Sequence, residues 1–318
     1  MIPVSELYGK YRLLECISAT QVAELFRAKS HGVEGFEKVV AIKRISRAAA
    51  RLNGYIEAFI EEAKAAVKLS HANLVQVFDL GQVDRTFYLA MEHVNGPDLG
   101  QIIERLHILR LRVPLDLSIH LVCEVIKAID YAHRRKDYQL RPLNLVHSGV
   151  HPWNILVSLD GEVKVTNFGA LRLQSLLPPS MRPPVEAWSP YLATEVQQGS
   201  LPLVGSPQGQ SADIYAAGAV LLDLLAGRPP QHAGEVDPLL LSLHGIPSGL
   251  AEILRRSLHP DPAQRYPRSG ELYEALVALL FHAGLKPSNR ALASFITDLL
   301  SRPLPQGARF APREPPPP

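Results

Sequence analysis

The sequence predicts an α+β protein with a small β-rich N-terminal lobe and a larger, mostly helical C-terminal lobe. The first observation is a loose alternation of apolar and polar residues over 11–29, followed by the apolar run 39–43, which together indicate strands. The second is the helical spacing of apolar residues along 115–135, which predicts a long helix with one buried side. An apolar content of 47% in 318 residues is enough for one large domain or two lobes.

Composition and charge exclude several classes of protein. A formal net charge of +2 favours neither nucleic-acid nor membrane partners. Two cysteines, Cys16 and Cys123, do not make a disulfide framework and fit a reducing compartment. The chain does not open on a basic and then apolar leader, and its longest apolar stretch, 216–226, is too short for a membrane span. We therefore expect a cytoplasmic protein without a membrane span.

The chain divides into four segments in order. Residues 1–10 are expected to be a short lead-in, and 11–92 form the strand-rich N-lobe with one helix. The C-lobe is expected over 93–300 and ends in an additional amphipathic helix. Residues 301–318 are rich in Pro and Arg and end in four prolines, which predicts an extended, disordered tail.

The stretch from His147 to Gly169 organises the rest of the sequence. It resembles the catalytic loop of the protein kinase family, H-R-D-L-x-x-x-N, and the D-F-G block that follows it after a short hairpin. His147, Asn154 and Phe168-Gly169 keep the family's frame. Matching blocks occur in family order over about residues 11–283, and they look most like bacterial Ser/Thr kinases of the eukaryotic type. The resemblance implies the two-lobed kinase fold, with a β-rich N-lobe containing the family's C helix.

Two acidic residues of the family pattern are missing. Gly149 stands where the resemblance implies the catalytic Asp, and a residue without a side chain cannot accept the substrate's proton. Asn167 stands at the metal-binding Asp, and its neutral carbonyl oxygen is a poorer Mg²⁺ ligand than a carboxylate. Asn154 is the retained metal-side residue. The resemblance therefore implies a weak or absent Mg²⁺ site at Asn154 and Asn167, and a degraded kinase.

The nucleotide positions are partly retained. Lys43 ends an apolar strand, as the family's phosphate-binding lysine does, and Glu62 is implied as its partner on the C helix, with Glu61 as the competing choice. The glycine-rich loop is lost, because Ser18 and Thr20 replace its first glycines. An ordinary hairpin without ligand is the alternative there. The remaining positions implied for an adenine pocket, which leave ATP binding open, are Leu25, Ala41, Met91, the backbone of Glu92 and Val94, and Leu156.

Two further contacts implied by the resemblance are structural. Asp213 is expected to accept backbone hydrogen bonds from the loop that begins at His147. Glu195, at the end of the family's activation segment, is expected to pair with Arg265. That segment, residues 170–195, carries five prolines, which predicts a stiffened loop.

These patterns favour a pseudokinase, a kinase-like domain that acts as a scaffold or allosteric regulator in signalling. Its partner would be a protein, such as an active kinase or the substrate of one. The alternative is a weak or atypical ATP-dependent Ser/Thr kinase in which another carboxylate helps Asn154 to hold the metal. A third possibility keeps ATP as a structural ligand that needs no metal.

Overall fold

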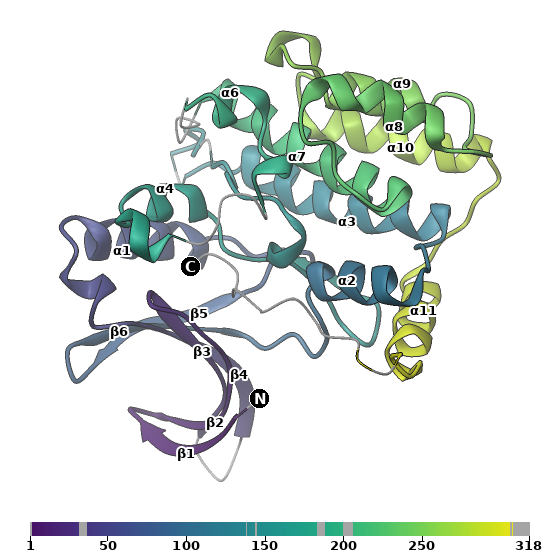
Figure 1. Cartoon of the computed structure of the whole chain (residues 1–318). Coiled ribbons are helices and arrows are strands. Elements are labelled where there is room, and N and C mark those ends of the chain that lie inside the picture. Colours follow the sequence, from purple (N-terminus) through teal and green to yellow (C-terminus); the bar gives the residue numbers. More distant parts are fainter. Residues whose placement is uncertain are drawn as a thin grey trace. The chain divides into compact units, whose positions relative to one another are not determined.

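The computed structural model describes residues 2–31, 37–137, 139–143, 145–182, 188–199, 206–305 and 307. The chain forms two compact units (Figure 1). Unit 1 contains Met1–Val94 and Phe168–Pro183, and unit 2 contains Asn95–Asn167 and Pro184–Ala311. The activation segment is thus divided, because its first part belongs with the N-terminal sheet. Of the tail expected over 301–318, residue 301 ends the last helix, and residues 306 and 308–318 lie outside the described residues.

Unit 1 is built on a six-stranded antiparallel sheet that curves strongly (Figure 1). Its edge strand was not expected, because residues 1–10 were predicted only as a lead-in, whereas this stretch pairs with the next strand along the chain. Each strand of the sheet is hydrogen-bonded to the strands on either side of it. In spatial order the strands are β1 (Ile2–Tyr8), β2 (Tyr11–Ala19), β3 (Ala23–His31), β4 (Glu37–Ile45), β6 (Thr86–Glu92) and β5 (Val77–Val83).

The two faces of this sheet bury separate apolar clusters, because side chains alternate along each strand. On one face, Ala41 and Ile45 of β4 pack with Phe59 of helix α1 (Tyr55–Val67). Residues from helix α4 (Ala170–Ser175) and the turn after it join this cluster. The predicted helix of the N-lobe is therefore confirmed, and the sheet face that it covers also carries Lys43.

The opposite face of the sheet is closed by β1. Tyr8 is buried and lies edge-on to Tyr88, with the ring centroids 5.6 Å apart. Its hydroxyl donates a hydrogen bond to the carbonyl of Thr86, at 3.3 Å. The guanidinium of Arg44 lies over the Tyr8 ring, 5.3 Å from its centroid. The N-terminal strand therefore covers a second core, which residues from β2, β3, β4 and β6 complete.

Unit 2 consists mainly of helices, as predicted. Helix α7 is buried along most of its length and packs against α3, which in turn packs against α10. No helix in the described ranges is both long and apolar enough to cross a membrane. The elements are α2 (Leu99–Leu109), α3 (Leu115–His133), β7 (Ile155–Val157), β8 (Val163–Val165), α6 (Thr194–Gln197), α7 (Pro207–Ala226), α8 (Val236–Ser242), α9 (Leu250–Ser257), α10 (Ser269–His282) and α11 (Asn289–Ser301).

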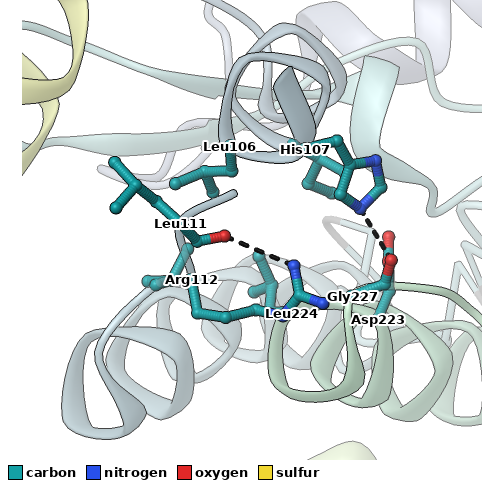
Figure 2. A pocket seen from close by; sticks show the side chains of 9 residues that line it. Leu106, His107, Leu111, Arg112, Asp223, Leu224 and Gly227 are labelled. Atoms are coloured by element: carbon teal, nitrogen blue, oxygen red, sulfur yellow. Dashed lines mark hydrogen bonds between the residues drawn. The ribbon is translucent and has the colours of Figure 1, made fainter. Parts of the chain in front are cut away.

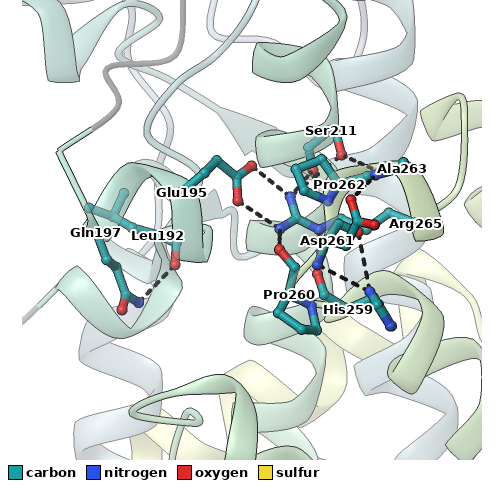
Figure 3. A network of polar contacts seen from close by, with 10 residues as sticks. All are labelled: Leu192, Glu195, Gln197, Ser211, His259, Pro260, Asp261, Pro262, Ala263 and Arg265. Carbon is teal, nitrogen blue, oxygen red and sulfur yellow. Dashed lines mark hydrogen bonds and ion pairs between the residues drawn. The ribbon is translucent and has the colours of Figure 1, made fainter.

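A buried arginine connects three distant segments of unit 2 (Figure 3). Both terminal nitrogens of Arg265 pair with the carboxylate of Glu195, each at 2.8 Å, so the predicted ion pair is confirmed. The same guanidinium donates to the carbonyls of His259, at 2.7 Å, and of Ser211, at 3.2 Å. The Arg265 side chain has no exposed surface, so these acceptors replace its water.

Helix α11 packs against α2 and the β7–β8 turn. Leu292, Ile296 and Leu299 form its buried side. Arg105 of α2 donates to the carbonyls of Leu299, at 2.7 Å, and Leu300, at 2.9 Å, and so caps its last turn. The additional helix predicted at the end of the C-lobe is therefore part of the packed unit.

Candidate functional site

Asp213, near the start of α7, anchors the loop that begins at His147. Its carboxylate accepts hydrogen bonds from the backbone amides of His147, at 2.7 Å, and Ser148, at 2.8 Å, which confirms the predicted role. His133 of α3 also contacts this carboxylate, at 2.9 Å. Ser148 has a φ of 57°, which is rare for a residue with a side chain. The carboxylate thus fixes a loop conformation that is costly by itself.

The two asparagines expected at the metal site are hydrogen-bonded to each other. The side-chain nitrogen of Asn167 donates to Oδ1 of Asn154, at 2.8 Å. Asn154 is fully buried, and its own nitrogen donates to the carbonyl of Gly149, at 2.8 Å, and to Nε2 of His151, at 3.0 Å. Both amide protons of Asn154 and one oxygen lone pair are therefore used within unit 2.

This donor set does not fit Mg²⁺. The two residues at the expected positions are neutral amides, whereas Mg²⁺ favours carboxylate and phosphate oxygens. The oxygen of Asn154 that would bind the ion already accepts a hydrogen bond from Asn167. No group of three or more His, Cys, Asp or Glu side chains suited to a metal occurs among the described residues. A metal ion at this place would have to break the hydrogen bond between Asn167 and Asn154. The two neutral amides would then compensate little of its positive charge.

His151 supports the same closed arrangement. It is buried, and the loss of water around its ring lowers its pKa to about 3, so the imidazole is neutral at physiological pH. A neutral ring can accept a hydrogen bond from the side-chain amide of Asn154 at Nε2, whereas an imidazolium has no free lone pair to accept it. The ring lies 5.7 Å from that of Trp153, centroid to centroid. A sequence match alone did not indicate this role of His151.

The unit 1 residues predicted to bind a nucleotide share one face of the sheet. Leu25 of β3 is directly opposite Lys43 of β4, and Ala41 of β4 is opposite Met91 of β6. Burial lowers the pKa of Lys43 to about 8, since water around the ammonium is replaced by protein. The structure therefore brings these four predicted residues together.

The turn between β2 and β3, where the glycine-rich loop was expected, is closed by its own hydrogen bonds. Oγ1 of Thr20 accepts from the backbone amides of Val22, at 2.9 Å, and Ala23, at 2.8 Å. Val22 is buried in the core next to α1, and its carbonyl accepts from the amide of Ser46, at 2.8 Å. Backbone amides at such a turn could bind phosphates, but these two are already used.

Glu62 has a different partner from the one predicted. The sequence analysis expected an ion pair with Lys43, but the structure pairs Oε1 of Glu62 with Arg172 of α4, at 3.2 Å. Arg172 also contacts Oε2 of Glu61, at 2.6 Å. The prediction was wrong because it placed no cation in the segment after Gly169, which folds into unit 1 as a helix.

The remaining predicted positions lie at the junction of β6 with the following chain and in unit 2. The amide of Glu92 donates to the carbonyl of Gln76, at 2.8 Å, so this amide serves the sheet. Val94 is the last residue of unit 1 before Asn95. Leu156 is on β7 of unit 2 and forms a bridge with Asp98.

Sequence reasoning did not predict the roles of three residues of the site. Thr20 carried a local signal, because a threonine two or three residues before the amides that it binds is typical of a turn. His151 and Arg172 carried no such signal. Their roles depend on which buried residue or helix lies beside them, and only the folded chain determines that.

A small pocket in unit 2 lies apart from these residues (Figure 2). It is enclosed by α2, the chain after it and the end of α7, and its lining includes His107, Arg112 and Asp223. The hydroxyl of Tyr191 donates to Oδ2 of Asp223, at 2.7 Å, but Oδ1 of this buried carboxylate has no hydrogen-bond partner. Burial raises the pKa of Asp223 to about 6.

Comparison with known proteins agrees with this architecture. Residues 23–301 match the family described as the protein kinase domain. The tyrosine-protein kinase MasK of Myxococcus xanthus (strain DK1622) is 29% identical over 292 residues, which cover 88% of this chain and 44% of MasK. The serine/threonine-protein kinase PrkC of Bacillus subtilis (strain 168) is 28% identical over 296 residues, which cover 89% of this chain and 42% of PrkC.

Solved structures show the same fold. The PknI kinase domain of Mycobacterium tuberculosis matches with a TM-score of 0.64 at 22% identity, over 88% of this chain and all of that chain. The chain spans less than half of the length of MasK and of PrkC. The predicted kinase fold, with a β-rich N-terminal sheet and a helical C-terminal region, is confirmed. The chain belongs to the protein kinase family and is homologous to bacterial serine/threonine kinases.

Proposed function

We propose that this chain is a pseudokinase that acts as a scaffold or allosteric regulator for another signalling protein. The observation that carries the proposal is the hydrogen bond from Asn167 to Asn154, in a loop where Gly149 replaces the general base. This bond joins the two residues that should hold the metal. Without a firmly held metal, the negative charge of a transferring phosphoryl group is poorly compensated.

The turn between β2 and β3 supports the proposal from unit 1. Because Thr20 engages the amides of Val22 and Ala23, a bound phosphate would have to compete with a formed turn. Loss of a general base typically costs about 10² to 10⁴ in rate. A weakened phosphate cradle and metal site add to that loss. Transfer by the mechanism of active kinases is therefore disfavoured at three separate positions.

The proposed partner is a protein, either an active protein kinase or its substrate. The contacts that preserve the fold, such as Asp213 with the loop and Arg265 with Glu195, are retained although the chemical residues are changed. Such a pattern is expected of a domain whose folded surface binds a protein partner.

The alternative, a weak ATP-dependent Ser/Thr kinase, is favoured by one observation. Lys43, Leu25, Ala41 and Met91 lie on one sheet face in a register suited to a nucleotide. A radiolabelled-ATP assay with generic substrates separates the two functions. A pseudokinase shows no turnover above background, whereas turnover that Lys43→Ala abolishes would establish the alternative and contradict the proposal.

Nucleotide binding is tested separately by thermal shift with ATP, with and without Mg²⁺. A ligand at a hundredfold excess over its dissociation constant stabilises a protein by about 2.7 kcal/mol, which such a measurement detects. Equal shifts in both conditions indicate ATP as a structural ligand without metal. A shift that requires Mg²⁺ contradicts our account of the site.

Restoring the two acids gives a sharper prediction. In Gly149→Asp/Asn167→Asp, the amide pair is lost and two carboxylates face the loop, so Mg²⁺-ATP should raise the melting temperature where it does not in the parent chain. Thermal shift with Mg²⁺-ATP and with ATP alone measures the effect. Asn53→Asp, which makes the same residue change as Asn167→Asp at an exposed position of unit 1, is the control and should not respond. Unchanged Mg²⁺-ATP affinity in the double variant would show that the missing acids are not the cause.

A further inference from the structure

The pocket between α2 and the end of α7 combines apolar walls with a buried charge (Figure 2). Leu106 of α2 and Leu224 of α7 are among its apolar lining residues. Asp223, in the last turn of α7, lines it with a carboxylate. Apolar walls with a few fixed polar groups are typical of sites that bind small ligands.

The carboxylate of Asp223 is only half satisfied. The residue is 1% exposed, and its Oδ2 accepts a hydrogen bond from the hydroxyl of Tyr191, at 2.7 Å. Its Oδ1 has no hydrogen-bond partner among the described residues. Leaving a buried acceptor unpaired costs free energy, and the cost is larger when the group is charged. A cationic hydrogen-bond donor at Oδ1 would remove this cost.

The C-terminal end of α7 adds carbonyl oxygens to this negative environment. Such ends attract cations, because the last carbonyls have no partner within the helix and the macrodipole is negative there. Nε2 of His107 donates to the carbonyl of Gly227, at 2.6 Å. The guanidinium of Arg112 contacts the carbonyl of Ala226 only at 3.5 Å and that of Leu111 at 3.3 Å. His107 is thus firmly bound, whereas Arg112 is an exposed and loosely held cation.

Gly227 shapes the place that the guanidinium of Arg112 occupies. Its φ is 80°, and a Cβ placed there would lie 2.3 Å from Cζ of Arg112. The missing side chain therefore lets the guanidinium lie against the backbone. With Arg112 in place, the space left in the pocket is about that of one water molecule. A larger ligand must displace Arg112, and the long contacts of this side chain oppose its displacement only weakly.

We propose that this pocket is a binding site for an alkylguanidinium group and that Arg112 is its displaceable internal occupant. The ligand donates hydrogen bonds to Oδ1 of Asp223 and to the carbonyl of Ala226. Its alkyl stem packs on Leu106 and Leu224. A guanidinium suits the position because its several N–H donors can serve a carboxylate and a carbonyl together. The inference goes beyond the proposed function and stands whether or not the chain transfers phosphate.

Methylguanidinium is the probe, used with the full chain at concentrations well below those that denature proteins. In the parent chain Arg112 competes with it, so Arg112→Ala should raise its affinity by about tenfold or more. NMR titration of the amides of Ala226 and Gly227 measures this. Arg255→Ala, which removes an arginine from an exposed ion pair of unit 2, is the matched control and should keep the parental affinity. Tetramethylammonium, a cation without N–H donors, should not bind.

Two measurements show whether Asp223 receives the ligand. In Arg112→Ala/Asp223→Asn the negative charge is lost, and the affinity for methylguanidinium should fall by about tenfold or more relative to Arg112→Ala. Without a substitution at Asp223, bound methylguanidinium should lower its pKa from about 6, because a nearby cation favours the carboxylate. The carboxyl-carbon NMR shift of Asp223 measures this pKa in Arg112→Ala, in which Tyr191 and His107 are the other titratable groups that face it.

A capped Gly-Arg-Gly peptide distinguishes two sources of the group. Tighter binding than that of methylguanidinium indicates an arginine of a protein partner, and equal or weaker binding indicates a small free cation. The inference is overturned if Arg112→Ala binds methylguanidinium no more tightly than the parent chain and Arg255→Ala. It is also overturned if adding Asp223→Asn leaves the affinity unchanged, or if methylguanidinium does not lower the pKa of Asp223.

Discussion

At the scale of single residues, Asn154 shows how side-chain hydrogen bonds hold the loop together. Its side chain donates to Gly149 and His151 and accepts from Asn167. The side-chain amide at position 167 donates the hydrogen bond that Oδ1 of Asn154 accepts. A carboxylate there would place two oxygens against each other unless a cation lay between them. The amide at position 167 therefore holds Asn154 by a hydrogen bond.

The positions of Asn154, Asn167 and Gly149 could be predicted because their residue types follow a local motif. Their mutual hydrogen bonds could not, since two amides at a metal site are compatible with several arrangements. His151 was also unpredictable, because its neutral state results from burial by the surrounding chain. Sequence spacing thus identified which residues meet, and the fold determines which of their atoms interact.

The buried carboxylate of Asp223 gives a prediction about pH. Its pKa is about 6 in the folded chain and about 3.8 when exposed, so the protonated form favours folding. Its contribution to stability is present below about pH 4 and is lost as the pH rises through about 6. A rise of this size corresponds to about 3 kcal/mol. Asp223→Asn should remove that loss, as measured by urea unfolding between pH 4 and pH 7.5.

The variant comparison is needed because other groups titrate in the same range. His151, with its lowered pKa, makes stability increase with pH and so acts in the opposite direction. Tyr191, His107 and Arg112 face Asp223 and remain in both proteins. Asp237→Asn, at an exposed carboxylate, is the control and should follow the parent profile. Parallel profiles for Asp223→Asn and the parent would contradict the prediction.

At the scale of elements, strand β1 and helix α4 are the main additions to what the sequence indicated. The first eight residues include a proline and only a short apolar alternation, which is a weak strand signal. Their conformation results from pairing with β2 and from packing of Tyr8 on Tyr88. The prolines of segment 170–195 predicted a stiffened loop, whereas the residues before Pro178 form the short helix α4.

Strand β1 should be important for the stability of unit 1. Tyr8→Ala removes a buried ring and its contacts with Tyr88 and Arg44, so the free energy of unfolding should fall by about 3 kcal/mol. Denaturant unfolding of the full chain measures this loss. Leu7→Ala, at the neighbouring position, is the control, because Leu7 is 74% exposed and its truncation should change stability by less than about 0.5 kcal/mol. Similar losses in both variants would mean that β1 does not close the second core.

At the scale of the whole molecule, the elements that keep the kinase architecture are separable from those that would run its reaction. Asp213 and Arg265 each join segments that are far apart in the sequence, and both were predicted correctly. Such anchors can be recognised from sequence because each depends on one charged residue in a fixed motif. The division of the chain into two units, with residues 168–183 assigned to the first, depends on many weak contacts and could not be predicted from any motif.

The Arg265 network should dominate the stability of unit 2. Arg265→Met leaves the carboxylate of Glu195 and several carbonyls without their donor, so thermal and denaturant unfolding should show a loss of about 3 to 5 kcal/mol. Glu195→Gln keeps an acceptor and should cost less. Arg255→Met removes an arginine from an exposed pair and should lie within about 0.5 kcal/mol of the parent. Equal effects of the two arginine substitutions would contradict the role of the network.

Helix α11 determines where a shortened protein can end. A Cβ at Gly161 in the β7–β8 turn would lie 1.9 Å from the carbonyl of Asn289, so that hairpin is shaped to lie flush with the helix. Ending the chain after α10 would remove the helix that packs against α2, and would leave the guanidinium of Arg105 without the carbonyls of Leu299 and Leu300. An expression boundary placed after α10 would therefore yield aggregation-prone material, whereas a stop after residue 302 keeps that flank of α2 covered.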